Sequence, residues 1–421
     1  MSAPRLLARR NLSRTRSRGR VIVASLAMSV ALMVTGGYLA QTVRTIVTGG
    51  NYEGMRSVDL SASYNGYSEG GVLSQAQDFQ EGSKAVVDAA NQLTDVSNVR
   101  SYTSCWASGM LPNGSIDTSI QRNQDGTLGS YSVSDMGAAA GTVNLVIPDA
   151  ASWRRIAEAA GVDETSDAIA LNSYRIHNDD GSVTYTRPLV AKGDLTLVLA
   201  ESRGEASSSL LSMDADGTPL VRYCTEGGTD DTTATEQSVP LDELSSQQRT
   251  LHVAALLDKL PDDLEWMASP DNFPTYLVSP CLKDNLADVI YPSSTIVGMQ
   301  AKDSTRSMDE LEAALPKYSD AMHFMDIASE TRNTRLALET MTLFCLLFSL
   351  IMVLIAVANV FNTLSNSMLL RTREFAMLKS VGMGQGAFRK MVVYECASYA
   401  LRGLGWGLAL SLTISFLLYR S

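Results

Sequence analysis

Three long apolar segments separate the polar stretches of this chain. Residues 21–43 form 23 consecutive uncharged positions, residues 341–361 form a second apolar core, and a third runs from about 396 to 419. A helix rises 1.5 Å per residue, so about 20 apolar residues cross a hydrocarbon core of about 30 Å. We therefore predict transmembrane helices within residues 21–45, 331–361 and 396–419.

The second apolar segment belongs to a longer helical pattern. No Gly or Pro occurs in residues 317–381, and strong helix formers begin near Ile327. A continuous helix over residues 327–368 has 42 residues. Its length is about 63 Å, about twice the hydrocarbon thickness. The pattern predicts a stalk above the membrane that continues into the second span; the alternative is a helix, a turn and a separate span.

Positive charge indicates which segments face the cytoplasm. Residues 5–20 contain seven arginines and no acid. The segment between the second and third spans, residues 362–395, is also basic, with Arg371, Arg373, Lys379, Arg389 and Lys390. Short basic segments beside spans stay inside. We expect residues 1–20 to form an interfacial helix that contacts membrane lipid.

The large segment between the first two spans has the opposite charge. Residues 46–335 contain 19 Lys and Arg against 42 Asp and Glu, a net charge of −23, whereas the whole chain carries −11. This asymmetry places residues 46–330 outside the membrane with the N-terminus inside. The basic residues flank spans and form no stripe with aromatic residues, which excludes nucleic acid as a predicted partner.

Alternating apolar patterns and turn signals predict an α+β fold for residues 46–330. We expect two small strand–helix–strand modules near the two ends of the segment, with a β-rich insert between them. Turns are expected at residues 178–181 and 214–217, and Ser307 with Glu310 has the spacing of a helix capping box. Expected strands are residues 57–63, 96–107, 168–176, 182–190, 195–200, 220–224, 275–279 and 295–301. Expected helices are residues 83–93, 153–160, 285–290 and 308–315.

The segment between the second and third spans also carries a motif. Residues 368–381 have a rough helical stripe of apolar positions, and Gly382 and Gly384 follow it. The run RTREFAMLKSVGM, followed by FRKMVVYE, closely resembles the cytoplasmic segment of FtsX-like permeases, the membrane subunits of MacB-type ATP-driven complexes. The matching positions are Arg371, Arg373, Glu374, Phe375, Ala376, Leu378, Ser380, Gly382 and Met383.

This resemblance implies a permease subunit in a bacterial cytoplasmic membrane, with a MacB-type, two-lobed outer domain. Its implied partners are a separate cytoplasmic ATP-binding subunit and a second permease chain. Phe375 and Met383 would fill a groove of the ATPase, and neighbouring charges would orient the contact. The expected ATPase-coupling residues are Arg371, Arg373, Glu374, Phe375, Leu378, Lys379 and Met383.

Two features concern the third span. Gly403 and Gly407 have the small-residue spacing that lets two membrane helices approach closely, so we expect them to mark a helix contact. The family's usual module has four spans, and here the fourth is absent. The sequence is compatible with a fragment or with half of a split permease.

Catalytic motifs are scarce. No phosphate-binding GxxxxGK[ST] loop, HExxH motif or cysteine–histidine zinc pattern occurs, so we expect no catalytic residue, cofactor or metal site. Residues 66–70 match G-x-S-x-G around Ser68, although a flexible Gly/Ser loop explains them better than a nucleophile elbow does. Among Cys105, Cys224 and Cys281 at most one disulfide is possible.

The sequence therefore leaves three functional hypotheses. The first is a permease subunit that transmits ATPase motion across the membrane, for export or extraction of a peptide or lipid-like substrate. The second is a membrane-anchored sensor whose outer domain binds a ligand, and the third is a tethered hydrolase that uses Ser68. Recovery of an ATP-binding subunit with the chain separates the first from the other two.

Overall fold

A computed structural model describes residues 16–48, 57–65, 76–120, 127–177, 183–201, 208–224, 236–271, 273–370, 372–380 and 384–420. The chain divides into two compact units. Residues 1–50 and 332–421 form a helical unit, and residues 51–331 form a sheet unit. Each unit is described separately below.

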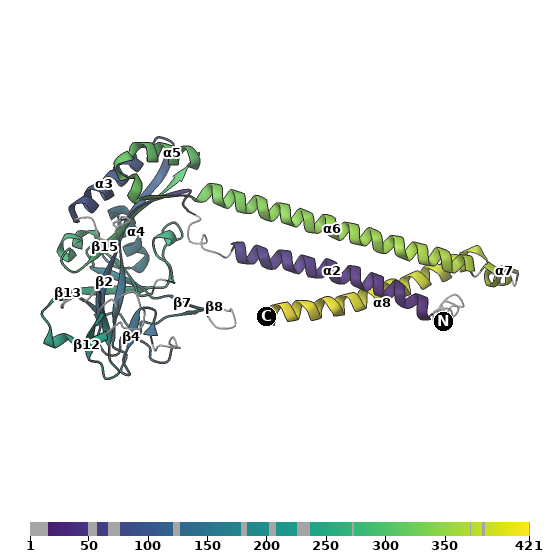
Figure 1. The fold of residues 1–421 in the computed structure, drawn as a ribbon, viewed down its shortest axis with the longest axis horizontal. Coiled ribbons are helices and arrows are strands. Elements are labelled where there is room, and N and C mark those ends of the chain that lie inside the picture. Colours follow the sequence, from purple (N-terminus) through teal and green to yellow (C-terminus); the bar gives the residue numbers. More distant parts are fainter. Residues whose placement is uncertain are drawn as a thin grey trace. The chain divides into compact units, whose positions relative to one another are not determined.

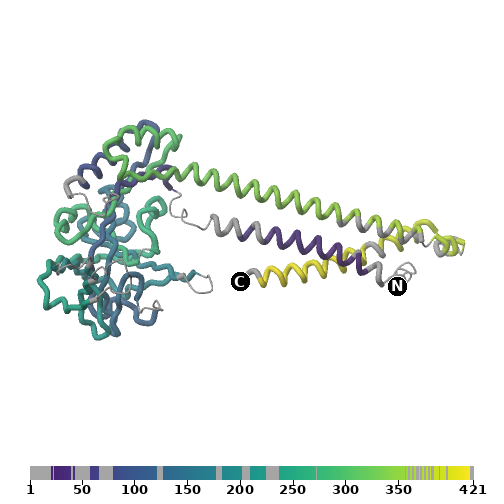
Figure 2. Tube along the Cα trace, in the orientation of Figure 1, coloured from purple at the N-terminus to yellow at the C-terminus, as the bar shows by residue number. Residues whose placement is uncertain are grey.

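In the part of the chain that the structure describes, the helical unit consists of the long helices α2 (Arg16–Thr48), most of α6 (Ile327–Leu370) and α8 (Gln385–Arg420), and of the short helix α7 (Thr372–Ser380). Within the described residues, Ile327–Ile355 and Gln385–Leu417 are long and apolar enough to cross a membrane, and α2 holds a shorter apolar stretch, Val23–Tyr38. α2 and α8 lie side by side, purple and yellow in Figure 2.

The long second helix is confirmed. α6 contains 44 residues without interruption, so the alternative with a turn before the span is wrong. Its length is about 66 Å at the usual rise per residue. Because α6 continues to Leu370, the amphipathic helix expected over residues 368–381 begins later and is only the nine residues of α7.

The sheet unit is organised by one 11-stranded sheet, in the order β16-β1-β15-β2-β9-β13-β6-β14-β5-β4-β3. Separate small sheets are formed by β10, β11 and β12 and by the β7–β8 hairpin. The strands are β1 (Leu60–Asn65), β2 (Val96–Leu111), β3 (Thr127–Leu128), β4 (Tyr131–Val133), β5 (Ala139–Pro148), β6 (Ala168–Leu171), β7 (Tyr174–His177), β8 (Val183–Thr186), β9 (Asp194–Ala200), β10 (Ser208–Met213), β11 (Pro219–Cys224), β12 (Glu236–Pro240), β13 (Ser246–Leu257), β14 (Thr275–Val278), β15 (Tyr291–Ala301) and β16 (Met322–Asp326).

Three α-helices accompany these strands: α3 (Ala76–Gln92), α4 (Ala150–Ala160) and α5 (Ser304–Ala314). Figure 1 shows α3 and α5 together beside the β15 part of the sheet. Their apolar faces share a core with β1 and β15, which includes Leu60, Phe79, Val86, Val297 and Leu311. The two chain ends of the sheet unit therefore fold into one lobe.

The expected pair of terminal modules needs correction. β1, α3 and β2 form the first, but residues 285–290 form only 3-10 turns and no α-helix. The second module is instead β15, α5 and β16, and the two modules interleave as neighbouring strands. The β-rich middle is not a separate insert, because the 16-residue β2 pairs with β15 and also with β5 and β9.

Some of the turns, caps and strands predicted from local sequence are confirmed and others are wrong. The turn at Asp214 is confirmed by the Gly217 N–H, which donates to Asp214 O at 3.0 Å. The expected capping box is wrong: α5 is capped by Asp303, whose carboxylate accepts from the Arg306 N–H, and Ser307 is buried. The strand expected over residues 168–176 is interrupted at Asn172, because its buried side chain bonds both backbone groups of Leu189. The turn expected at residues 178–181 lies outside the described residues.

Candidate functional site: a short basic helix, a tight helix pair and the base of the sheet unit

The expected ATPase-coupling residues fall largely on α7. Arg373, Glu374, Phe375, Leu378 and Lys379 lie within this helix, and the Arg373 side chain is exposed. Arg371 and Met383 lie outside the described residues. Positions 375 and 378 are three apart, so they share one side of the helix. α7 is thus a short helix between two long ones, and its sequence contains an apolar pair and several charged residues.

Glycines create a close contact between α2 and α8. Gly403 and Gly407 are buried in α8, and a Cβ added at Gly403 would lie 2.6 Å from Leu26 Cβ. A Cβ at Gly407 would lie 2.6 Å from Val30 Cβ and 2.8 Å from the Ala27 backbone oxygen. Such distances leave no room for a side chain, so the two backbones approach as only glycine allows.

Gly405 provides the contrast, because a Cβ there would meet nothing within 4 Å. The face of α2 that receives α8 was missed from the sequence. Ala27 and Ala31 are buried there at 8% and 3% exposure, four residues apart. This small-residue spacing on the first span is the signal that could have found it.

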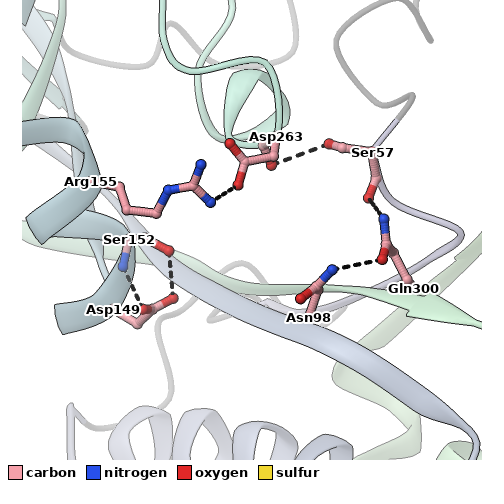
Figure 3. A network of polar contacts seen from close by, with 7 residues as sticks. All are labelled: Ser57, Asn98, Asp149, Ser152, Arg155, Asp263 and Gln300. Atoms are coloured by element: carbon pink, nitrogen blue, oxygen red, sulfur yellow. Dashed lines mark hydrogen bonds and ion pairs between the residues drawn. The ribbon is translucent and has the colours of Figure 1, made fainter. Parts of the chain in front are cut away.

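A polar network holds the segment with which the sheet unit begins (Figure 3). The Ser57 hydroxyl donates to Asp263 O at 3.2 Å, and Gln300 Nε2 donates to Ser57 O at 3.4 Å. Gln300 Oε1 in turn accepts from Asn98 Nδ2 at 2.7 Å. Ser57 is therefore bonded on one side to β15 and on the other to the loop around Asp263.

The same network reaches α4. Arg155 of α4 forms an ion pair with Asp263, and Asp149 caps the helix by accepting from the Ser152 N–H at 2.9 Å. Asp149 also accepts from the Ser101 N–H of β2 at 2.9 Å. An N-cap satisfies backbone groups that a helix leaves unpaired. These bonds connect the segment around Ser57 to α4, β2 and β15.

A separate open cavity of about 550 Å³ lies on the sheet unit. Arg187 and Asp258 form an ion pair at 2.6 Å at its wall, with both side chains more than half exposed. Hydrogen bonds from Ser119 hold the pKa of Asp117 below its usual range, so this carboxylate stays ionised at neutral pH. The lining residues are Asp117, Ile120, Ser173, Tyr185, Thr186, Arg187 and Asp258.

The candidate catalytic, metal-binding and cysteine residues do not form a site within the described residues. Ser68 lies outside them. No group of three or more His, Cys, Asp or Glu side chains with a metal-holding arrangement occurs within the described ranges. Cys105 and Cys281 have free thiols, and burial, offset in part by Lys283, raises the pKa of Cys105 to about 12.

Comparison with known families gives a match in the helical unit. Residues 346–420 match the model of a family described as FtsX-like permease C-terminal, a range that contains the second half of α6, α7 and α8. The match supports the FtsX-like permease family, whose members are membrane-integral, generally non-enzymatic transport components. They generally work with a cytoplasmic ATP-binding subunit. Comparison with curated proteins gave no match.

Proposed function

We propose that this chain is a MacB-type permease subunit of an ATP-driven transporter, which carries motion of a cytoplasmic ATPase across the membrane to the sheet unit. The match of residues 346–420 to the FtsX-like permease family is the observation that carries the proposal. α7 is the ATPase contact and α6 the transmitting element. The sheet unit lies outside a bacterial cytoplasmic membrane, and the N-terminus inside.

The shape of α6 supports a transmitting role. It links the two units as one helix of 44 residues, with no Gly or Pro from Ile327 to Leu370. Kinks in helices nearly always need Pro, Gly or a bulge, so an uninterrupted helix of this kind moves as a rod. A displacement at its α7 end is carried to its other end without a hinge.

The chemistry of α7 supports the contact. Arg371, Arg373, Glu374 and Lys379 set the orientation against the ATPase, while Phe375, Leu378 and Met383 provide apolar anchors. The proposed work is export or extraction of a peptide or lipid-like substrate by a pair of permease chains. Such a cycle needs a bistable pair of membrane subunits and no active site in this chain.

Co-purification of the ATP-binding subunit with the full chain tests the proposal. The double variant Phe375→Ala, Leu378→Ala removes the apolar pair and should lose the ATPase, since buried anchors carry most of an interface's energy. Met377→Ala is the matched control: it truncates an apolar residue of the same helix that is 62% exposed. Position 377 lies on the opposite side from 375 at 3.6 residues per turn.

The outcomes separate the hypotheses. Loss of the ATPase in the double variant, with retention in Met377→Ala, is expected. Retention of the full amount of ATPase by the double variant would remove α7 as the coupling contact. Absence of any ATP-binding subunit from the wild-type preparation would instead favour a membrane-anchored sensor. The cavity beside Asp117 and Arg187 is the observation that favours this second function.

A further inference from the structure

In the sheet unit, burial of α6 is confined to its first few residues. Ile327, the first residue of α6, is 3% exposed and packs in the core cluster that contains Val58, Leu264, Trp266 and Met267. Ala328 and Ser329 are partly buried, whereas Glu330 and the three residues after it are exposed. Within the sheet unit, α6 is therefore held by residues 327–329.

One side of this first turn is bonded to the sheet through Asp59. The Ala328 N–H donates to Asp59 O at 3.0 Å. The Asp59 carboxylate accepts from the Ala301 N–H of β15, also at 3.0 Å. A helix start leaves backbone N–H groups without intrahelical partners, and here the segment leading into β1 supplies one. The start of α6 is thereby fixed to β1 and β15.

The other side is bonded to α5 through Asp326. Its Oδ1 accepts from the Ser329 N–H at 2.9 Å, as an N-cap does. Its Oδ2 accepts from the Thr305 hydroxyl at 2.8 Å, and this hydroxyl also lies 3.3 Å from the Ser329 hydroxyl. The side chain of Ser304, the first residue of α5, is a further hydrogen-bond partner of Asp326. One carboxylate therefore joins the first turns of two helices by charge-assisted hydrogen bonds.

The Thr305 hydroxyl is not needed to cap either helix. Asp303 caps α5, and the Asp326 oxygen that caps α6 is not the one that Thr305 binds. Thr305 is also exposed, whereas Leu311 anchors α5 in its core at 0% exposure. Capping of α6 explains the bond between Asp326 and the Ser329 N–H. It does not explain why the Thr305 hydroxyl of α5 bonds to Asp326 and lies beside Ser329.

We infer that the first turn of α6 is the joint at which its motion enters the sheet unit, with Ser304 and Thr305 as the positioning residues that make α5 follow α6. The inference rests on the proposed transmitting function and specifies its receiving end. Motion of α6 draws Asp326, and with it Thr305 and α5, while Asp59 carries the same motion into β1 and β15. The lobe formed by α3, α5, β1 and β15 responds first.

Hydrogen exchange on the full chain, purified with its bound ATPase, tests the joint. Exchange is compared without nucleotide and with MgATP and vanadate. Thr305→Val removes one hydroxyl at constant shape, and Thr305→Ser keeps it. The double variant Ser304→Ala, Thr305→Val removes both hydroxyls that bond Asp326. The matched control is Thr340→Val in α6, where the hydroxyl bonds only Leu336 O of its own helix at 2.7 Å.

In Thr305→Val we expect amides of residues 328–331 to exchange about fivefold faster without nucleotide, the effect of losing one exposed bond to a carboxylate. In the double variant Ser304→Ala, Thr305→Val the nucleotide-dependent change in α5 should be lost, while ATPase binding, Thr305→Ser and Thr340→Val stay as in the wild type. A nucleotide-dependent change in α5 that survives the double variant overturns the joint alone. Absence of that change in the wild-type complex overturns the transmitting function and the joint together.

Discussion

Alanine at Gly407 would place a methyl carbon 2.6 Å from Val30 Cβ and 2.8 Å from the Ala27 backbone oxygen. Neither atom can turn aside, because a Cβ and a carbonyl oxygen are fixed by the backbone of α2. Carbon atoms in contact normally lie about 3.5–4.0 Å apart, so α2 and α8 must separate by about 1 Å. Gly407→Ala therefore tests whether this helix pair is as tight as the structure shows.

The magnitude follows from a comparison with Gly405→Ala. Both variants gain the helix propensity of alanine over glycine, about 1 kcal/mol. Only Gly407→Ala also overpacks the interface, which typically costs about 1–3 kcal/mol. The gain is common to both, so Gly407→Ala should be less stable than Gly405→Ala by about 1–3 kcal/mol. Gly403→Ala should fall between them, since it meets one atom fixed by the backbone, Leu26 Cβ at 2.6 Å, whereas Gly407→Ala meets two.

Thermal unfolding of the full chain in detergent micelles measures this order, with size-exclusion chromatography as the readout of folded protein. Gly405→Ala should melt at or above the wild-type temperature, Gly403→Ala below it, and Gly407→Ala lowest. Equal melting of Gly407→Ala and Gly405→Ala would show that α8 does not approach α2 through Gly407.

Three further predictions concern the sheet unit. Ile327→Ala should lower the free energy of unfolding by about 2–4 kcal/mol, because it empties a buried site; a shifted urea midpoint at unchanged slope would show this, and an unshifted midpoint would refute it. Cys105, with its pKa raised to about 12 by burial, should resist maleimide at pH 8 while the exposed Cys281 reacts, as mass spectrometry of the labelled chain would reveal. Burial raises the pKa of Asp326, but hydrogen bonds from Ser304, Ser329 and Thr305 outweigh it and leave that pKa below its usual value. The stability advantage of wild type over Asp326→Asn should thus be full at pH 7 and shrink as pH falls below about 4, and pH-independent melting differences would contradict it.

The elements most accurately predicted from sequence are those fixed by local chemistry. The continuity of α6 follows from the absence of Gly and Pro between Ile327 and Leu370, and no distant contact is needed to predict it. The turn before Gly217 follows from its Asp-Gly signal, which the structure matches with a positive φ of 91°. These features would look the same in many folds.

The arrangement of the sheet could not be predicted, because it rests on pairings between distant residues. β1 pairs antiparallel with β15, and Leu60 lies opposite Met299, a residue far away in the sequence. β16 was missed because Met322–Asp326 has only five residues and lacks a clear alternation of buried and exposed positions. The helix predicted over residues 285–290 is a 3-10 turn over Asp284–Leu286 followed by irregular turns, since local composition does not distinguish a short turn from a true helix.

The candidate site shows the same division. Gly403 and Gly407 could be recognised by spacing, but the α2 residues that receive them could not be assigned without the structure. The joint at Asp59, Thr305 and Asp326 depends on three segments meeting in space, and polar residues before a helix predict a cap and nothing more. Sequence therefore indicated the helices of the helical unit better than the connection between α6 and the sheet.

Transmission along α6 is tested most directly by hydrogen exchange of the sheet unit in a Val353→Pro complex, with and without MgATP and vanadate. Val353 lies within α6, where proline removes a backbone hydrogen bond, kinks the helix and costs about 3 kcal/mol. The variant should keep its bound ATPase but lose the nucleotide-dependent change in α5 and β1 that the wild type shows. A Val353→Pro complex whose sheet unit responds to nucleotide as the wild type does would contradict the transmitting role of α6.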